Sequence, residues 1–222
     1  MGSIYWEALA PPTRRVFEAL AELPMPADFY LAGGTALALQ IGHRVSYDLD
    51  FFTPNNPLGE VERAALVRQL QHLSSVVVKH ESAEQLYTNI MGVEVSFIFQ
   101  HHPLLFQTRE VNGLYLAQPT DIGLMKLSAI KDRGTRRDFV DLYSLRDIAP
   151  FEKLFHLLPQ KYFDRPDFTV HLAYALQYFK DAESDTHELR TLKRISWAAV
   201  KKYCTTGSNL LSKINAGLEP PQ

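Results

Sequence analysis

Two carboxylates lie two residues apart within an apolar run of the sequence. Asp48 and Asp50 flank Leu49 and are followed by two phenylalanines, a pattern typical of a strand. Because side chains alternate along a strand, both carboxylates should point to one face, close together. Two such anions repel unless a cation lies between them, and oxygen ligands favour Mg²⁺ or Mn²⁺. The pair predicts a divalent metal site, with an ion pair to nearby Arg44 as the alternative.

The spacing of this pair is not specific by itself, because the sequence contains four acid-x-acid pairs. The other three lie in polar segments: Glu60/Glu62, Asp181/Glu183 and Glu183/Asp185. What distinguishes Asp48 and Asp50 is their apolar context, since an unpaired charge in a buried strand costs several kcal/mol.

A glycine turn precedes the acidic strand by about a dozen residues. Gly33, Gly34 and Thr35 follow an apolar run at 29–32 that predicts a short strand, and they open a predicted helix at 35–41. Free backbone N–H groups and the positive end of a helix meet at such a point, which favours binding of an anion such as phosphate. Steric demand alone also explains glycine here, and Thr35 is most simply a helix N-cap.

The elements that position these residues form a strand, glycine turn, helix and strand unit. The pattern predicts an α/β (α+β) fold, with a mixed sheet and flanking helices in residues 1–118 and a mostly helical half in 119–222. Further strands are expected at 75–80, 86–91, 93–99 and 114–117. Helices are expected from Pro11 and at 58–73, 120–131, 136–149, 166–180 and 192–204.

Composition narrows the class of protein but names no partner. The chain has 222 residues, 46% of them hydrophobic, and a formal net charge of −2, so any contact with nucleic acid needs a local basic face. The single Cys204 has no disulfide partner in the chain, which fits a reducing compartment. No apolar run is long enough for a membrane span, and we expect a cytoplasmic protein.

Charges interrupt the apolar faces of two consecutive predicted helices in the second half. Lys126 and Arg133 share a stripe with apolar residues, and Asp138 and Asp141 do so on the next helix. Charges on inward faces must be paired, so these residues either brace the two helices or border a cleft. Further cations, Arg136 and Arg137 among them, form a basic rim for an RNA end or solvated helix faces.

The run LAGGTALALQIGHRVSYDLDFF resembles the signature of the nucleotidyltransferase superfamily. The stretch from Gly42 to Phe52 is more narrowly similar to the AbiEii/AbiGii toxin family, whose members are nucleotidyltransferase-like toxins of toxin–antitoxin and phage-defence systems. A second block, with Lys126, Arg133 and an Arg137-Asp138 pair, is similar to a later motif of that family. The two blocks span about residues 29 to 145, in the order the family has them.

The resemblance implies a nucleotidyltransferase-like fold and Mg²⁺-dependent use of a nucleoside triphosphate (NTP). In that reading Gly33, Gly34 and Thr35 hold the β and γ phosphates, and Asp48 and Asp50 hold the metal. It also implies that Lys126 meets the triphosphate and that Asp138 is an acid needed for activity. His43 and Arg44, which enter the acidic strand, and Ser46 beside them complete the expected nucleotide-binding set.

The sequence departs from the superfamily pattern at a third carboxylate. Most enzymes of this fold carry that acid on a later strand, here the predicted strand 93–99, where Ser96 occupies the expected position and Glu94 shares its face. Either Glu94 substitutes, or the site has two carboxylates, which weakens activation of an acceptor hydroxyl.

The combined interpretation is a metal-dependent nucleotidyltransferase that moves a nucleoside monophosphate (NMP) to a hydroxyl, with a tRNA 3′ end or another RNA as acceptor and an antitoxin protein as partner. The alternatives are a catalytically silent nucleotide-binding regulatory protein, which Ser96 motivates, and transfer to a small molecule such as an aminoglycoside.

Overall fold

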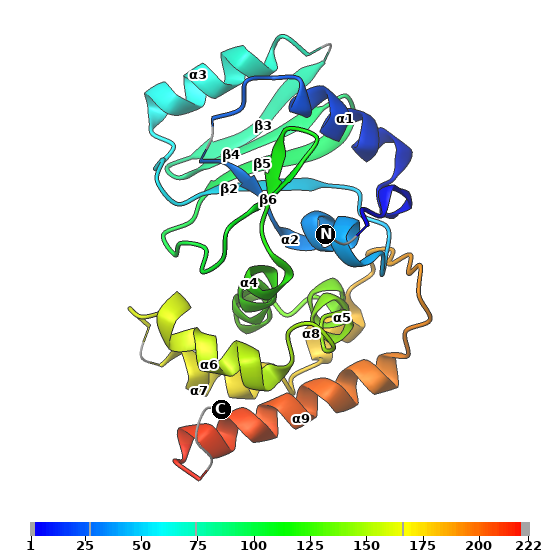
Figure 1. Ribbon diagram of the computed structural model, residues 1–222, viewed down its shortest axis with the longest axis vertical. Coiled ribbons are helices and arrows are strands. Elements are labelled where there is room, and N and C mark those ends of the chain that lie inside the picture. Colours follow the sequence, from blue (N-terminus) through cyan, green and yellow to red (C-terminus); the bar gives the residue numbers. More distant parts are fainter. Residues whose placement is uncertain (1–2, 27, 74, 166, 219–222) are drawn as a thin grey trace. The chain divides into compact units, whose positions relative to one another are not determined.

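The computed structural model describes residues 3–26, 28–73, 75–165 and 167–218. The chain divides into two compact units, Met1–Gln118 and Pro119–Gln222. Each is described separately, and Figure 1 shows the elements of both. The expected α/β architecture is confirmed: a mixed sheet with helices is followed by helices.

A seven-stranded sheet organises the first unit, with the strands in the order β3-β4-β5-β2-β1-β7-β6. The central strands pair in both directions: β2 runs antiparallel to β1 and parallel to β5, and β1 runs parallel to β7. This sheet places the acidic strand β2 between β1, the strand that precedes it in the chain, and β5, which is more distant in sequence. The strands are β1 Tyr30–Leu31, β2 Leu49–Thr53, β3 Val76–Ser82, β4 Gln85–Ile90, β5 Val93–Phe99, β6 Arg109–Val111 and β7 Leu114–Leu116.

The helices of the first unit are the 3-10 turn η1 (Trp6–Ala8), α1 (Pro11–Ala21), α2 (Gly33–Ile41) and α3 (Glu60–Leu70). α1 begins with prolines, whose missing N–H groups cost nothing in a first turn, and it buries Val16, Phe17 and Leu20. α2 is mostly apolar, and all of its residues except Gly33 and Gln40 are buried. It ends at Gly42, whose φ of 60° is the left-handed conformation that favours glycine.

Aromatic rings pack the sheet between β2 and β5. Phe51 stacks on Phe97 with 5.4 Å between ring centroids, and Phe29 meets Phe97 edge to face at 5.7 Å. All three rings are buried. This packing supports the register of β2 against β5, and that register determines which residue lies beside Asp50.

The second unit is helical. Its longest helix, α9, packs against α7 and α5, and α4 packs against α5, α6 and α7. The helices are α4 Pro119–Asp132, α5 Arg136–Ser144, α6 Phe151–Lys161, α7 Phe168–Ala175, α8 Lys180–Ser184 and α9 Trp197–Asn215.

Several expected elements are wrong in extent, for identifiable reasons. The helix expected at 136–149 ends at Ser144, and α6, which was not expected, follows with Pro159 inside it. The helix expected at 166–180, whose first residue lies outside the described residues, is the shorter α7, and α8 begins only at Lys180. β6 was missed. α9 lies further along the chain than the expected 192–204 and runs through Gly207, where a Cβ would collide with the Phe151 ring. Tertiary packing here overrides a weak local helix propensity.

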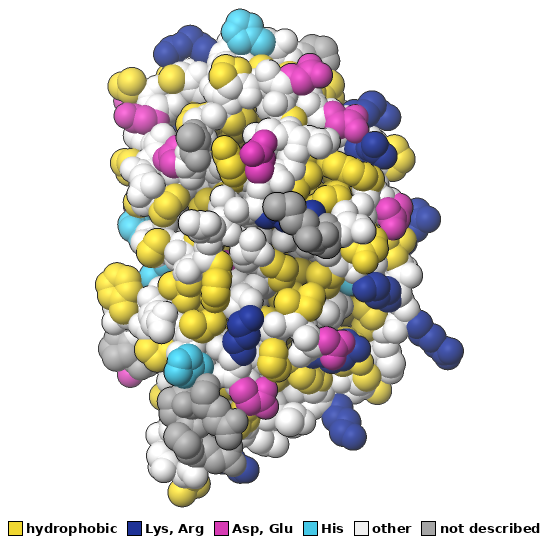
Figure 2. All heavy atoms as spheres, in the orientation of Figure 1, with side chains coloured by type: hydrophobic (Ala, Val, Ile, Leu, Met, Phe, Trp, Pro, Cys, Tyr) yellow, Lys and Arg dark blue, Asp and Glu magenta, His cyan; other side chains and the backbone are white. Residues whose placement is uncertain are grey.

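Acidic and basic side chains are interspersed on the face shown in Figure 2, with hydrophobic side chains between them. This distribution agrees with the small net charge of −2. Across the described ranges, none of the helices combines the length and apolarity needed to cross a membrane.

Candidate functional site

The start of α2 lies directly against the carboxylate of Asp50. Gly33 has a φ of +63°, and a Cβ built on it would lie 3.0 Å from Asp50 Oδ2. Glycine is required here for two reasons, the left-handed backbone and the close approach. The N-cap residue, Ala32, offers no side-chain cap to the first N–H groups of α2. Donors of this kind at a helix start suit a phosphate.

Thr35 is not the N-cap that the sequence predicts, because α2 begins two residues earlier. Its hydroxyl is buried and lies 2.5 Å from the backbone oxygen of Asp48 and 2.7 Å from Ser46 Oγ. Thr35 therefore ties the first turn of α2 to the segment that enters β2.

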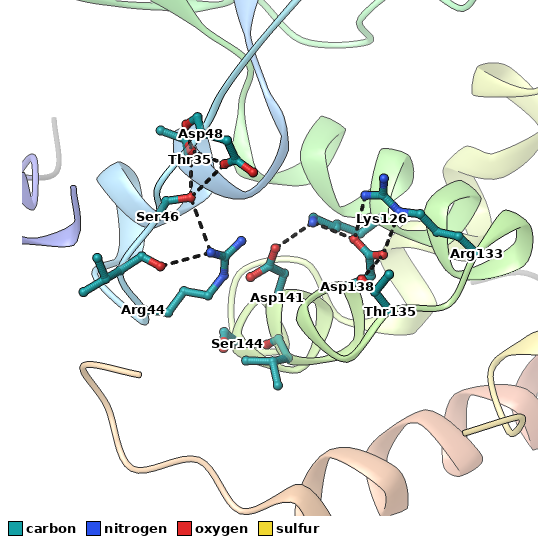
Figure 3. Close-up of polar contacts among 12 residues, drawn as sticks. Thr35, Arg44, Ser46, Asp48, Lys126, Arg133, Thr135, Asp138, Asp141 and Ser144 are labelled. Carbon is teal, nitrogen blue, oxygen red and sulfur yellow. Dashed lines mark hydrogen bonds and ion pairs between the residues drawn. The ribbon is translucent and has the colours of Figure 1, made fainter. Parts of the chain in front are cut away.

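A chain of polar contacts leads from Arg44 to Asp48 (Figure 3). Arg44 Nη1 donates to Ser46 Oγ at 3.3 Å and to the backbone oxygen of Val45 at 3.2 Å. Ser46 Oγ in turn donates to Asp48 Oδ1 at 3.3 Å, and Thr35 Oγ1 lies 3.2 Å from the same oxygen. Arg44 is buried, as is His43 before it. These contacts orient Asp48, whose side chain is only partly exposed.

Ser96 is the residue of β5 in register with Asp50. Its hydroxyl, also buried, donates to Asp50 Oδ1 at 2.5 Å. Glu94, the other candidate for a third carboxylate, is exposed. The Ser96 hydroxyl thus occupies the position expected for the third carboxylate. It is neutral, so it orients Asp50 and adds no charge.

The donor set of this first group fits a hard divalent cation. Asp48 and Asp50 supply carboxylate oxygens, the ligands that Mg²⁺ and Mn²⁺ prefer. Nowhere in the described ranges do three or more His, Cys, Asp or Glu side chains gather as a metal cluster. A cation held by two carboxylates would take its other ligands from phosphate oxygens and water, as Mg²⁺ usually does.

A second group of charged residues lies within the second unit, between α4 and α5 (Figure 3). Lys126 Nζ lies 2.8 Å from Asp138 Oδ1 and 2.7 Å from Asp141 Oδ2. Arg133 Nε donates to Asp138 Oδ2 at 3.1 Å, and Thr135 Oγ1 donates to the same oxygen at 2.7 Å. The helix–helix brace considered from the sequence is therefore present.

Burial makes these charges interdependent. The side chains of Lys126, Asp138 and Asp141 are 7%, 1% and 0% exposed. Burial by itself raises the pKa of Asp138, but Lys126 and Arg133 outweigh it and hold that pKa well below its ordinary value. Asp138 is consequently an anion at any physiological pH.

Two contacts were not foreseen from the sequence. The Ser96–Asp50 bond depends on a strand register that local patterns do not reveal. Thr135, by contrast, precedes Asp138 by three residues at the start of α5, and this spacing of a hydroxyl and an acid is a recognisable helix-start signal.

Solved structures of two other proteins share the fold of this chain. The nucleotidyltransferase toxin MenT4 of Mycobacterium tuberculosis superposes with a TM-score of 0.54 at 15% identity, covering 92% of this chain and 84% of that one. A protein of Helicobacter pylori assigned as a nucleotidyltransferase gives a TM-score of 0.53 at 19% identity, covering 93% and 94%. The fold is that of the nucleotidyltransferases.

Sequence comparison then places the chain in a family. The model of the nucleotidyl transferase AbiEii toxins, of type IV toxin–antitoxin systems, matches residues 15–213. An uncharacterised protein of Aquifex aeolicus is 36% identical over 183 residues, which cover 79% of this chain and 85% of that protein. The chain belongs to the AbiEii family of nucleotidyl transferase toxins, which confirms the resemblance seen in the sequence.

Proposed function

We propose that this protein transfers an NMP from an NTP to a hydroxyl acceptor in a reaction that depends on Mg²⁺ or Mn²⁺. It would act as the toxin of a toxin–antitoxin system, with an RNA such as a tRNA 3′ end as acceptor and an antitoxin protein as partner. The observation that carries the proposal is the contact between the start of α2 and Asp50. That contact puts a phosphate-binding helix start beside a candidate metal ligand.

In the proposed reaction the chain mainly positions groups that are already reactive. Backbone N–H groups at Gly33, Gly34 and Thr35 hold the β and γ phosphates, and Asp48 and Asp50 hold the cation. A cation held there would supply positive charge to the phosphates, including the leaving pyrophosphate. The Thr35 and Ser46 hydroxyls keep Asp48 in place, and the Ser96 hydroxyl does the same for Asp50.

His43 and Arg44 complete the proposed nucleotide-binding set with Ser46. Both residues are buried, so their orientation is fixed by the fold rather than by the ligand. Lys126 and Asp138 complete the proposed catalytic set, with the role for Lys126 that the family resemblance implies, contact with the triphosphate. Both belong to the brace between α4 and α5, so a loss of activity in their variants must be separated from a loss of stability.

One observation favours a second candidate, a protein that binds nucleotide without turning it over. Ser96 replaces the expected third carboxylate and donates to Asp50, so it supplies no base to the acceptor hydroxyl. Binding without transfer in the experiment below would favour this candidate. Transfer to a small-molecule acceptor such as an aminoglycoside, instead of RNA, would redirect the acceptor assignment.

The proposal is tested by comparing the wild type with the variant Asp50→Asn. Mg²⁺-dependent binding of NTP and transfer of NMP are measured for both. Isothermal calorimetry with each of the four NTPs should show binding to the wild type, with binding lost in the variant while its melting temperature is kept. Removing one of two crowded anions relieves repulsion, so the fold should not suffer. Transfer of labelled NMP to total tRNA, other RNA and aminoglycosides is followed in parallel.

The matched control is Glu110→Gln, which removes a negative charge from an exposed position on the edge strand β6. It should behave as the wild type in both assays. Unchanged metal-dependent NTP affinity in Asp50→Asn would refute the metal assignment.

A further inference from the structure

The last 30 residues that the structure describes, 189–218, include lysines and arginines but no acidic residue. They contain six basic side chains, whereas the chain as a whole contains 23 basic and 25 acidic ones. The segment consists of the loop before α9, α9 itself and the three residues after it, drawn in orange and red in Figure 1. One segment is thus strongly positive in a chain whose net charge is −2. Its cations are Arg190, Lys193, Arg194, Lys201, Lys202 and Lys213.

Exposed acids beside the segment offset only a part of this charge. Glu183 Oε1 lies 2.8 Å from Lys201 Nζ, so that lysine is already paired. Glu188 directly precedes the segment and is exposed. Three exposed cations of the segment form no ion pair within the part of the chain that the structure describes: Arg190, Arg194 and Lys202. Most of the positive charge therefore remains available to a ligand.

The exposed side of α9 is polar as well as basic. Val200, Cys204 and Leu211 are buried within the unit. With 3.6 residues per turn, the opposite and exposed side of the helix carries Lys202, Thr206, Asn209 and Lys213. Lys202 and Lys213 lie about 16 Å apart along the helix axis, at a rise of about 1.5 Å per residue. Charges this far apart do not converge on one small anion, so a ligand that meets several of them is an extended polyanion.

The chemistry of this side favours a nucleic acid over the other polyanions of a cell. A protein partner needs aromatic or apolar anchors at the centre of its interface, and a membrane needs a helix with an exposed apolar face. Along α9, which the structure describes in full, no large apolar side chain is exposed.

The residue types that are exposed are those that contact a sugar–phosphate backbone. Lysine, arginine, threonine and asparagine side chains make most of the phosphate and sugar contacts in protein–nucleic acid complexes. The hydroxyl of Thr206 and the amide of Asn209 also suit a 2′-hydroxyl, which is both a donor and an acceptor and is present in RNA alone. The ligand that fits best is therefore the backbone of an RNA.

We propose that segment 189–218 is a docking surface for the sugar–phosphate backbone of an RNA, with Arg190, Arg194 and Lys202 in contact with phosphates. Because backbone contacts carry no sequence information, the surface holds RNA without regard to its bases. The inference deepens the proposed function, on which it rests for RNA as the acceptor. It uses none of the residues proposed for catalysis or for nucleotide binding.

Fluorescence anisotropy of a labelled RNA hairpin measures binding to the full chain, in EDTA and without NTP, so that the proposed metal-dependent site takes no part. The variant Arg190→Gln/Arg194→Gln/Lys202→Gln changes three exposed side chains, so its melting temperature should stay that of the wild type. Each lost phosphate contact reduces the slope of log K against log salt by about 0.7–0.9. The slope should therefore fall by about 2–3, and the affinity at low salt should fall at least about tenfold.

The matched control is a second triple variant, Arg15→Gln/Arg68→Gln/Lys79→Gln. It removes the same charge from exposed positions in the first unit. It should keep the salt slope and the affinity of the wild type. An equal loss in both triple variants would mean that net charge alone attracts the RNA, and it would overturn the assignment to the segment. An unchanged slope in the first variant would overturn it as well.

Competitors test the chemistry of the ligand. Unlabelled hairpins of two different sequences should displace the labelled RNA equally, and poly-glutamate with the same number of charges should do so at least about tenfold less well. A preference of about tenfold between the hairpins would show that bases are read, against the proposal. Displacement by poly-glutamate or by anionic lipid vesicles as effective as that by RNA would assign the segment to an acidic protein or to a membrane, and either result would overturn the proposal.

The docking surface and the transfer reaction fail in different experiments. Asp50→Asn, which lies outside the segment, should keep the RNA affinity of the wild type in EDTA. The first triple variant should keep Mg²⁺-dependent NTP binding and should transfer NMP with a raised KM for RNA. Loss of RNA binding in that variant, together with no NTP binding by the wild type, would refute the transfer reaction and support the docking surface. Unchanged RNA binding would refute the docking surface and leave the Asp50→Asn test untouched.

Discussion

Lys126→Met separates the two roles open to the charged cluster of the second unit. The substitution keeps the aliphatic stem and removes the ammonium group, which lies 2.8 Å from Asp138 Oδ1 and 2.7 Å from Asp141 Oδ2. A lysine that served only a bound triphosphate would leave the melting temperature unchanged or raise it. A lysine that neutralises buried acids would lower it.

The structure predicts a large loss of stability. Removing one partner of a buried ion pair costs about 3–5 kcal/mol, because the remaining charge stays out of water. For a chain of this length each kcal/mol shifts the melting temperature by about 2–4 °C, so we expect a fall of about 6–20 °C. Calorimetric or circular-dichroism melting measures it, and Lys202→Met, at an exposed position on α9, is the control with little change.

Double variants identify the acid that depends on Lys126. Asp138 keeps Arg133 and Thr135 when Lys126 is replaced, and both Lys126→Met/Asp138→Asn and Lys126→Met/Asp141→Asn should recover part of the lost stability, the larger recovery marking the acid that depends more on Lys126. Activity is then measured in Lys126→Met/Asp141→Asn, which keeps the proposed catalytic Asp138. Activity that returns with stability makes Lys126 only a brace, whereas activity that stays lost supports its contact with the triphosphate. An unchanged melting temperature in Lys126→Met would refute the ion-pair reasoning.

Two further predictions follow from the same contacts. Gly33→Ala should weaken Mg²⁺-dependent NTP binding at least about tenfold in calorimetry, whereas Gly92→Ala, with an equally left-handed φ of +87° but no atom within 4 Å, should cost stability alone; equal effects on binding would contradict this. The pKa of Asp138 is lowered in the folded chain, so as the pH falls Asp138 is protonated in the unfolded chain before it is protonated in the folded chain. Stability should therefore fall as the pH drops below the ordinary pKa of 3.8. Denaturant unfolding should show this slope, and Asp138→Asn should reduce it.

The parts of the site that follow from the sequence are those encoded by neighbouring residues. The turn at Gly33 lies between a strand and a helix only a few residues away, and Asp48 and Asp50 share one short apolar segment. A pairing between Lys126 and Asp138 also follows from the sequence. Charges on the inward faces of two consecutive helices must be paired, and the opposite charges nearest in sequence lie on the other helix of the two. Local periodicity and the cost of buried charge are sufficient for all of these.

The parts that did not follow depend on contacts between distant segments. α6 was missed because Pro159 lies inside it, a position where proline usually argues against a helix. The far end of α9 was missed because Gly207, a poor helix former, is required for the approach of the Phe151 ring. In both cases packing of the whole unit decides a conformation that local propensity does not favour.

The contact between Ser96 and Asp50 has a consequence for the charge of the proposed metal site. A third carboxylate at the position of Ser96 would bring three anions together, which one divalent cation does not neutralise. With a hydroxyl there, only the two charges of Asp48 and Asp50 adjoin a single Mg²⁺ or Mn²⁺, so less repulsion opposes the approach of a triphosphate. The hydroxyl also occupies Asp50 Oδ1, while Oδ2 is the oxygen nearest to Gly33. The arrangement thus suits one cation shared with a triphosphate, and it leaves deprotonation of the acceptor hydroxyl to a group other than the residue paired with Asp50.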